Sequence, residues 1–246
     1  MKRFLKLTVI AIITFAFVSC SKTATDTGIA LTIVGYATSV SPSTAKSLRT
    51  TAAGFTISEA LLGIKDIEIG TETEHFSDAA DDKGGEKHQF DYSQSYLIDL
   101  LTGTSTPEIG FKDFAPGVYN KFEAETSGII AGNKSVSIKG AYTDSQSVVY
   151  TFEFSTASEL KFEFESATGF ELIEGSVLDL LMQVNISEIF AGVDFSKAIV
   201  NESNVIIIND ITNTGILAQI KANIHQMADM GEDHDHDRHF DGENHH

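Results

Sequence analysis

The residues best suited to chemistry lie at the carboxyl end of the chain, in the stretch EDHDHDRHFDGENHH at 232–246. Six of the 8 histidines lie between residue 225 and the last residue, and aspartates alternate with them. Imidazole nitrogens suit Zn, Cu and Ni, and a neighbouring carboxylate can complete such a site or accept the second ring N–H. The predicted ligands are His234, His236, His239, His245, His246, Asp233, Asp235, Asp237 and Asp241.

Calcium is the alternative occupant of the same stretch. Asp233, Asp235, Asp237 and Asp241 match positions 1, 3, 5 and 9 of an EF-hand-like loop. Two departures weaken this interpretation: Arg238 occupies the position of the turn glycine, and Asn244 occupies that of the closing glutamate. A polar tail that only solubilises the protein is a further interpretation of the segment.

A second polar stretch, TETEHFSDAADDKGGEKHQFD at 71–91, contains the other two histidines, His75 and His88. Its composition predicts a long, charged surface loop. A metal bridge between these histidines and the tail is a possible second function for it.

No enzyme motif is recognisable. The chain has no G-x-S-x-G, H-E-x-x-H or C-x-x-C, and GIIAGNKS at 128–135 fails the spacing of a phosphate-binding loop. We therefore expect a non-enzymatic protein.

The amino terminus has the pattern of a secretory signal. Lys2, Arg3 and Lys6 precede an apolar run at 7–18, which is shorter than the roughly 20 residues that a membrane-spanning helix needs. The run ends in FVSC, which resembles a bacterial lipobox, with Phe17 where Leu is usual. Cys20 is the only cysteine of the chain and the predicted site of lipidation. A plain signal peptide is the alternative.

The location predicted from this pattern is the outer membrane, with the protein anchored through Cys20. Ser21 follows the cysteine, which by analogy with known sorting rules favours the outer over the inner membrane. A dense acidic run after Cys20 is missing, so the periplasmic face is favoured over the cell surface. The formal net charge of -18 excludes nucleic acid as a partner and favours cations.

Strand patterns dominate the rest of the chain. In SELKFEFES, Leu160, Phe162 and Phe164 alternate with charged residues, as in a sheet with one face buried. Similar runs occur at 29–36, 55–69, 96–101, 118–126, 148–154, 178–186 and 205–208. Many short strands with polar turns predict a mainly β fold, an antiparallel β-sandwich.

One helix is predicted near the C terminus. NTGILAQIKANIHQM places Ile216, Ile220, Ile224 and Met227 at helical spacing. The predicted organisation is a signal peptide at 1–19, a lipidated tether at 20–28, a β-sandwich domain at 29–228, and a disordered His/Asp-rich tail at 229–246.

IDLLTG at 98–103, followed by PEIGFKDFAPGVYNKFE at 107–123, resembles a signature of uncharacterised bacterial lipoproteins. That family is described as a domain of unknown function with a transthyretin-like or carboxypeptidase-regulatory-like β-sandwich. The resemblance covers roughly 55–225 and implies a fold and a location, but no mechanism and no functional residue.

Together these patterns predict a non-enzymatic, lipid-anchored lipoprotein of the cell envelope. Its His/Asp-rich tail would capture Zn, Cu or Ni, with Ca as the lesser alternative. The rival prediction is an adhesion or scaffold module that binds an unknown envelope protein or glycan, with a tail that only solubilises.

Overall fold

The computed structural model of the protein describes residues 26–36, 54–71, 94–224 and 228–241. The predicted signal peptide, Cys20, the histidines of the 71–91 stretch, and His225, His245 and His246 lie outside the described residues. Within the described ranges, no helix combines the length and the apolar character needed to cross a bilayer.

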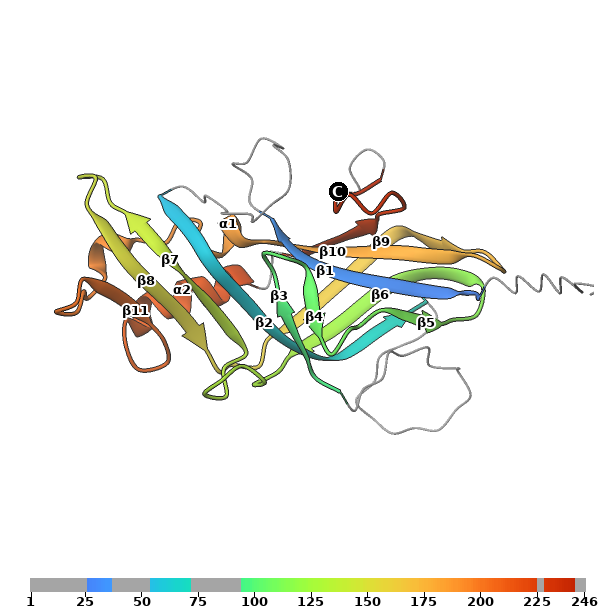
Figure 1. The fold of residues 1–246 in the computed structure, drawn as a ribbon, viewed down its shortest axis with the longest axis horizontal. Coiled ribbons are helices and arrows are strands. Elements are labelled where there is room, and N and C mark those ends of the chain that lie inside the picture. Colours follow the sequence, from blue (N-terminus) through green and yellow to red (C-terminus); the bar gives the residue numbers. More distant parts are fainter. Residues whose placement is uncertain (1–25, 37–53, 72–93, 225–227, 242–246) are drawn as a thin grey trace, which may run out of the picture.

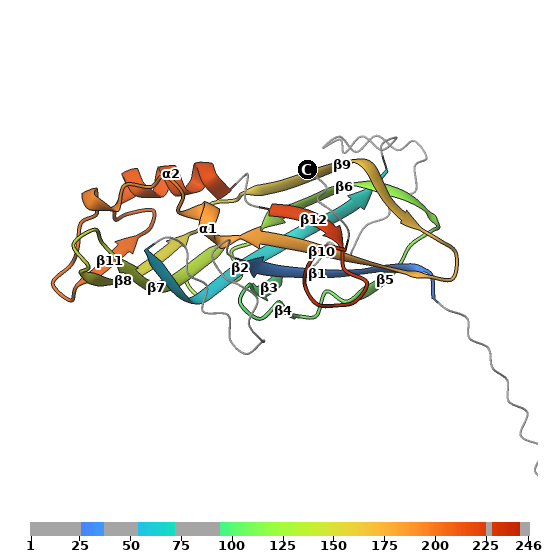
Figure 2. The same cartoon turned by 90° about the horizontal axis from the view of Figure 1, so that it is seen from above.

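The described residues fold into two β-sheets (Figures 1 and 2). The small sheet has the order β12-β10-β1-β5, with β1 at Gly28–Tyr36, β5 at Phe111–Asp113, β10 at Val177–Asn185 and β12 at Ala228–Glu232. The large sheet has the order β11-β8-β7-β2-β3-β4, and β6 pairs with both β2 and β9. Its strands are β2 (Phe55–Gly70), β3 (Tyr96–Asp99), β4 (Thr104–Thr106), β6 (Gly117–Thr126), β7 (Val136–Thr143), β8 (Val149–Thr156), β9 (Lys161–Leu172) and β11 (Val205–Ile208).

Alternating side chains of both sheets form one hydrophobic core. Ile29, Leu31 and Ile33 of β1 are buried at every second position, as expected where successive side chains point to opposite faces. Leu62 and Ile98 contribute to the same core from the large sheet. The prediction of a mainly β, sandwich-like fold is confirmed.

Strand pairing is mixed rather than wholly antiparallel. β1 runs parallel to β10, and β8 runs parallel to β11. Parallel neighbours need a long crossover between them. Here the pairs are far apart in the sequence, so alternation within each strand could not reveal its partner.

The predicted C-terminal helix is confirmed as α2 (Thr214–Ile224), whose apolar stripe is buried, while the predicted Met227 lies outside the described residues. A second, four-residue helix, α1 (Ile186–Ile189), was not predicted because one turn is too short to show a helical period. The Asn185 side chain caps α1 by accepting from the backbone N–H groups of Ser187 and Glu188.

Aromatic packing closes the core beneath α1 and the short 3₁₀ helix η1 (Phe195–Lys197). Phe55 stacks on Phe190 with ring centroids 4.7 Å apart and meets Phe195 edge-on at 4.8 Å. Phe152 of β8 also meets Phe55 edge-on, with ring centroids 5.1 Å apart. These rings join the large sheet to the segment that follows β10.

The predicted disordered tail does not begin at residue 229. Residues from Ala228 to Glu232 form β12, which pairs antiparallel with β10. Met230 is buried opposite Met182, and this apolar contact explains why the segment joins the sheet. The chain after Glu232 forms a loop that the structure describes as far as Asp241.

Candidate cation site

The aspartates of the tail lie in a closed loop at 233–241, here called the acidic loop. At its start, the backbone N–H of Asp233 donates to the carbonyl of Asp179 at 3.0 Å. At its end, the backbone N–H of Asp241 donates to the carbonyl of Glu232 at 2.8 Å. The loop therefore leaves β12 and returns beside it (Figure 1, dark red).

Three contacts hold the acidic loop on the outer face of the small sheet. The side-chain amide of Gln183 in β10 donates to the carbonyl of Arg238 at 2.8 Å. The Phe240 ring lies over Gly231, where an added Cβ would be only 2.4 Å from Cδ1 of Phe240. The Arg238 guanidinium lies near Gly103, in the turn between β3 and β4. Packing from three elements thus positions the loop.

The acidic loop gathers three carboxylates. One oxygen from each of Asp233, Asp235 and Asp237 lies within 4.8 Å of the other two. Asp233 is buried, with 5% of its surface exposed, while Asp235 and Asp237 face solvent. A divalent cation placed among these oxygens would therefore have protein ligands on one side and open positions for water on the other.

The backbone conformation explains why alternate side chains converge here. His236 and Arg238 have φ angles of 58° and 70°, in the left-handed region that non-glycine residues rarely adopt. The backbone N–H of Asp237 donates to the Asp235 carboxylate, and that of His239 donates to the Asp237 carboxylate. Arg238 stands where an EF-hand-like loop has its turn glycine, and it adopts the conformation that glycine would favour.

Asp233 is the least satisfied side chain of the group. Its Oδ2 accepts from the backbone N–H of Arg238 at 3.1 Å, but its buried Oδ1 has no hydrogen-bond partner among the described residues. Burial is the main cause of the raised pKa of Asp233, the negative charges of Asp237 and Asp235 add to the rise, and hydrogen bonds from the backbone N–H groups of Arg238 and Asp237 oppose it. A buried, unpartnered carboxylate oxygen is costly to the folded state, and a cation would supply the missing contact.

The tail histidines that the structure describes do not join this group. His234 lies between two other carboxylates, with Nδ1 3.0 Å from Asp241 Oδ2 and Nε2 3.5 Å from Glu232 Oε2. Asp241 also accepts from the backbone N–H of His234, and this contact is the main cause of its lowered pKa. Of the predicted ligands within the described residues, the structure thus groups Asp233, Asp235 and Asp237, and it places Asp241 with His234.

His236 and His239 stand in the acidic loop, but neither contributes to the three-carboxylate group. His236 lies between Asp235 and Asp237 in the sequence, and His239 follows Arg238, where the backbone has a positive φ angle. No pattern in the sequence predicted that Gln183 would hold the acidic loop or that Oδ1 of Asp233 would be unpartnered. Both depend on contacts between segments far apart in the chain.

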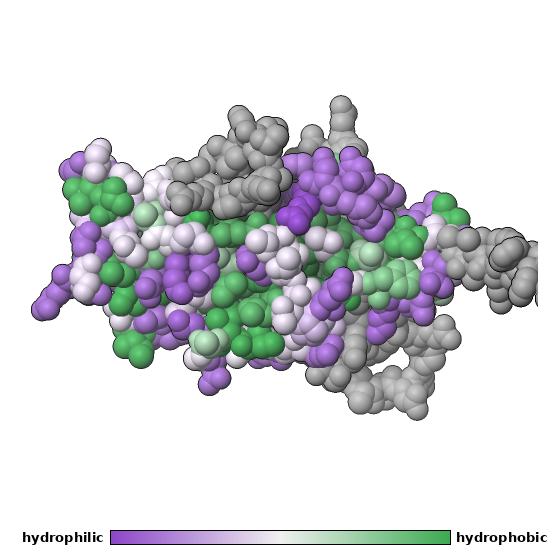
Figure 3. Space-filling view, in the orientation of Figure 1, coloured by the Kyte–Doolittle hydropathy of each residue, from purple (hydrophilic) through white to green (hydrophobic). Residues whose placement is uncertain are grey.

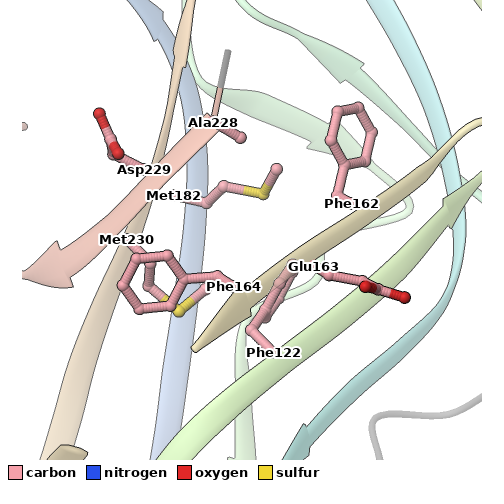
Figure 4. Close-up of a pocket in the computed structure, with 8 residues that line it drawn as sticks. All are labelled: Phe122, Phe162, Glu163, Phe164, Met182, Ala228, Asp229 and Met230. Atoms are coloured by element: carbon pink, nitrogen blue, oxygen red, sulfur yellow. The ribbon is translucent and has the colours of Figure 1, made fainter. Parts of the chain in front are cut away.

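A small cavity lies near β12 but offers no substrate site. It is lined mainly by apolar side chains between β9 and β10, including Phe162, Phe164, Met182 and Met230 (Figure 4). Its volume is about 10 Å³, room for roughly one water molecule. The carboxylates of Glu163 and Asp229 at its rim do not form a paired acid and base inside it.

Comparison with known proteins returned no match to this chain among protein families, curated proteins or solved structures. The resemblance to uncharacterised lipoproteins therefore stays a prediction.

Proposed function

We propose that this protein is a lipid-anchored, non-enzymatic component of a bacterial cell envelope whose acidic loop binds a divalent cation. The observation that carries the proposal is the buried Oδ1 of Asp233, which lacks a partner while two further carboxylates stand beside it. The anchoring part rests on the sequence pattern that ends at Cys20.

Calcium is the cation that this ligand set favours. Every member of the three-carboxylate group offers oxygen, the ligand of hard cations, whereas Zn, Cu and Ni favour imidazole nitrogen. A single loop with water completing the coordination predicts a modest Kd, on the order of 10⁻⁴–10⁻³ M, as in extracellular calcium modules. Such a site would be filled only where calcium is abundant.

Transition-metal capture is the second candidate, and a different observation favours it. His234 has an acidic side chain beside each ring nitrogen, from Asp241 and from Glu232. One imidazole with two carboxylates is a ligand set that Zn accepts. This candidate shares no side chain with the three-carboxylate group, so substitutions can separate the two.

Isothermal titration of the metal-free mature chain with CaCl₂ and, separately, with ZnCl₂ tests both candidates. We expect Asp235→Asn/Asp237→Asn to weaken calcium binding by at least about tenfold while leaving zinc binding intact. His234→Gln should do the reverse. Glu171→Gln/Glu174→Gln is the matched control, because it removes the same charge from two exposed acids elsewhere.

Either of two results would overturn the calcium proposal. One is a wild-type chain that takes up no calcium at millimolar concentration. The other is an equal calcium affinity in the wild type and in Asp235→Asn/Asp237→Asn.

A further inference from the structure

Four exposed apolar side chains gather at one end of the molecule, and we call them the apolar tip. They are Phe111 of β5, Val118 of β6, Ile173 in the β9–β10 turn and Val177 of β10, with 43%, 48%, 61% and 41% of their surfaces exposed. Scattered exposed apolar residues are ordinary, but a cluster at one end indicates a contact surface.

Two of these residues, Phe111 and Val177, lie beside Gly28, the first residue of β1. The Phe111 ring covers Gly28, where an added Cβ would lie 2.5 Å from Cε2 of that ring. Val177 is the register partner of Gly28 in the parallel pair of β1 and β10. Val118 of β6 pairs with Glu171 of β9, two residues before Ile173, so Val118 and Ile173 lie at the same end of the fold.

The chain enters the fold at the apolar tip. Thr27 accepts at its side-chain hydroxyl from the N–H of Gly175 at 2.7 Å, and its carbonyl accepts from Phe114 at 3.2 Å. Figure 3 shows hydrophobic side chains at this end of the molecule, where β1 begins in Figure 1. The start of β1 is therefore held between the β9–β10 turn and the end of β5.

Only a short segment separates Cys20 from the apolar tip. Cys20 precedes Thr27 by seven residues, which span at most about 25 Å when fully extended. If acyl chains on Cys20 enter a bilayer, the apolar tip is the part of the described fold closest to that anchor. The opposite end, with β11 and α2, lies far along the longest axis of the molecule (Figure 1).

The charges around the apolar tip indicate which lipid headgroups it can contact. Asp26, Asp113, Glu171 and Glu174 are exposed there, beside the half-buried Lys112 of β5. An anionic membrane surface would repel this excess of negative charge, and zwitterionic headgroups would not. The apolar side chains themselves favour the interface in proportion to the area they bury.

We infer that the apolar tip formed by Phe111, Val118, Ile173 and Val177 rests on the zwitterionic lipid surface in which Cys20 is anchored. The inference depends on the anchoring part of the proposed function and is independent of the cation site. The tip adds a second membrane contact to the acyl anchor, and it fixes which end of the sandwich faces the bilayer.

A labelling experiment on the full-length lipoprotein tests this orientation. Because Cys20 is the only cysteine, Ile173→Cys provides a single thiol for a fluorophore once Cys20 is acylated. The labelled protein is reconstituted in phosphatidylcholine vesicles that contain a headgroup-proximal spin-labelled lipid. Ile211→Cys is the matched control, since Ile211 is 90% exposed and lies between β11 and α2.

We expect the spin label to reduce fluorescence at residue 173 about twofold or more and to leave residue 211 unchanged, because an interfacial contact lies about 5–10 Å deep. Replacing part of the phosphatidylcholine with phosphatidylglycerol at low salt should reduce the quenching at residue 173. Equal quenching at both positions, or none at residue 173, would overturn the inference.

Mass spectrometry of the Cys20 peptide identifies which premise failed. An acylated Cys20 without quenching refutes the tip contact and leaves the anchor standing. An unmodified Cys20 refutes the anchor and the tip contact together.

Discussion

The side-chain amide of Gln183 donates a 2.8 Å hydrogen bond to the main-chain carbonyl of Arg238, joining the middle of β10 to the turn of the acidic loop. Gln183 is buried, with 7% of its surface exposed. Arg238 in turn donates its backbone N–H to Asp233. A continuous set of contacts therefore runs from the small sheet to the least satisfied carboxylate of the proposed site.

Gln183→Ala should weaken calcium binding although Gln183 is no predicted ligand. Without its amide, the Arg238 carbonyl loses a partner and the turn that aligns the aspartates is held less firmly. Changes to groups that orient metal ligands typically cost about 10–100-fold in affinity, and we expect the lower end here. Calorimetric titration measures the effect, with the exposed Gln146→Ala as control; a Kd within twofold of the wild type would contradict it.

Asp233→Asn should raise the melting temperature of the metal-free protein at neutral pH. The pKa of Asp233 is raised in the folded state, so ionisation of this carboxyl opposes folding as pH rises past its usual titration range. The amide keeps an acceptor for the Arg238 N–H and removes the buried charge. Thermal unfolding with and without EDTA measures this; a lower melting temperature for the metal-free variant would show that the buried charge is not a cost.

Saturating calcium should make the wild type more stable than Asp233→Asn. A ligand that binds only the folded state stabilises it by about 2.7 kcal/mol at a concentration 100 times its Kd. The wild type should gain this increment, and Asp233→Asn should gain little of it. Melting curves over a calcium series provide the measurement, and parallel gains in both proteins would exclude Asp233 as a ligand.

Calcium affinity should fall as the medium is acidified. Proton and cation compete for Asp233, and its raised pKa lets the proton compete above the pH at which an exposed aspartate would titrate. Titrations from about pH 7 down to about pH 4 should show the loss beginning above the usual aspartate pKa. An affinity that is constant until that usual range is reached would contradict the burial argument.

Gly231→Ala should loosen the acidic loop without touching a carboxylate. The new Cβ would lie 2.4 Å from Cδ1 of Phe240, so the ring must move off β12. We expect weaker calcium binding and faster proteolysis of the loop. Gly215→Ala is the control, because a Cβ there meets nothing within 4 Å; identical behaviour of the two variants would show that Phe240 does not hold the loop.

Gly140→Ala should destabilise the large sheet strongly. An added Cβ would lie 2.0 Å from the backbone carbonyl of Thr56, forcing β7 away from β2. We expect the free energy of unfolding to fall by at least about 2 kcal/mol, against about 0.5 kcal/mol or less for Gly117→Ala. Urea denaturation compares the two variants, since a Cβ on Gly117 meets nothing within 4 Å; equal losses would refute the steric argument.

The sequence by itself indicated most of the long strands and the helix α2, because burial of one face imposes a period of two or of 3.6 residues. It did not indicate β4, β5, β7 or β12. Alternation marked β9 through Phe162 and Phe164, and helical spacing marked α2 through Ile216 and Ile220. It also predicted the tail aspartates as candidate cation ligands, and the structure brings three of them, Asp233, Asp235 and Asp237, close together. It did not show that β1 pairs with β10 in parallel, because alternation says nothing about a distant partner.

Only the tertiary structure decided which tail residues come together. Pairing of Met230 with Met182 turned the start of the predicted disordered tail into β12. Packing against Gln183 and Gly103 then placed Asp233 in a buried position and left the histidines of the described tail outside the carboxylate group. Burial, and with it the unpartnered oxygen of Asp233, arises from contacts between segments far apart in the chain, and no local pattern encodes such contacts.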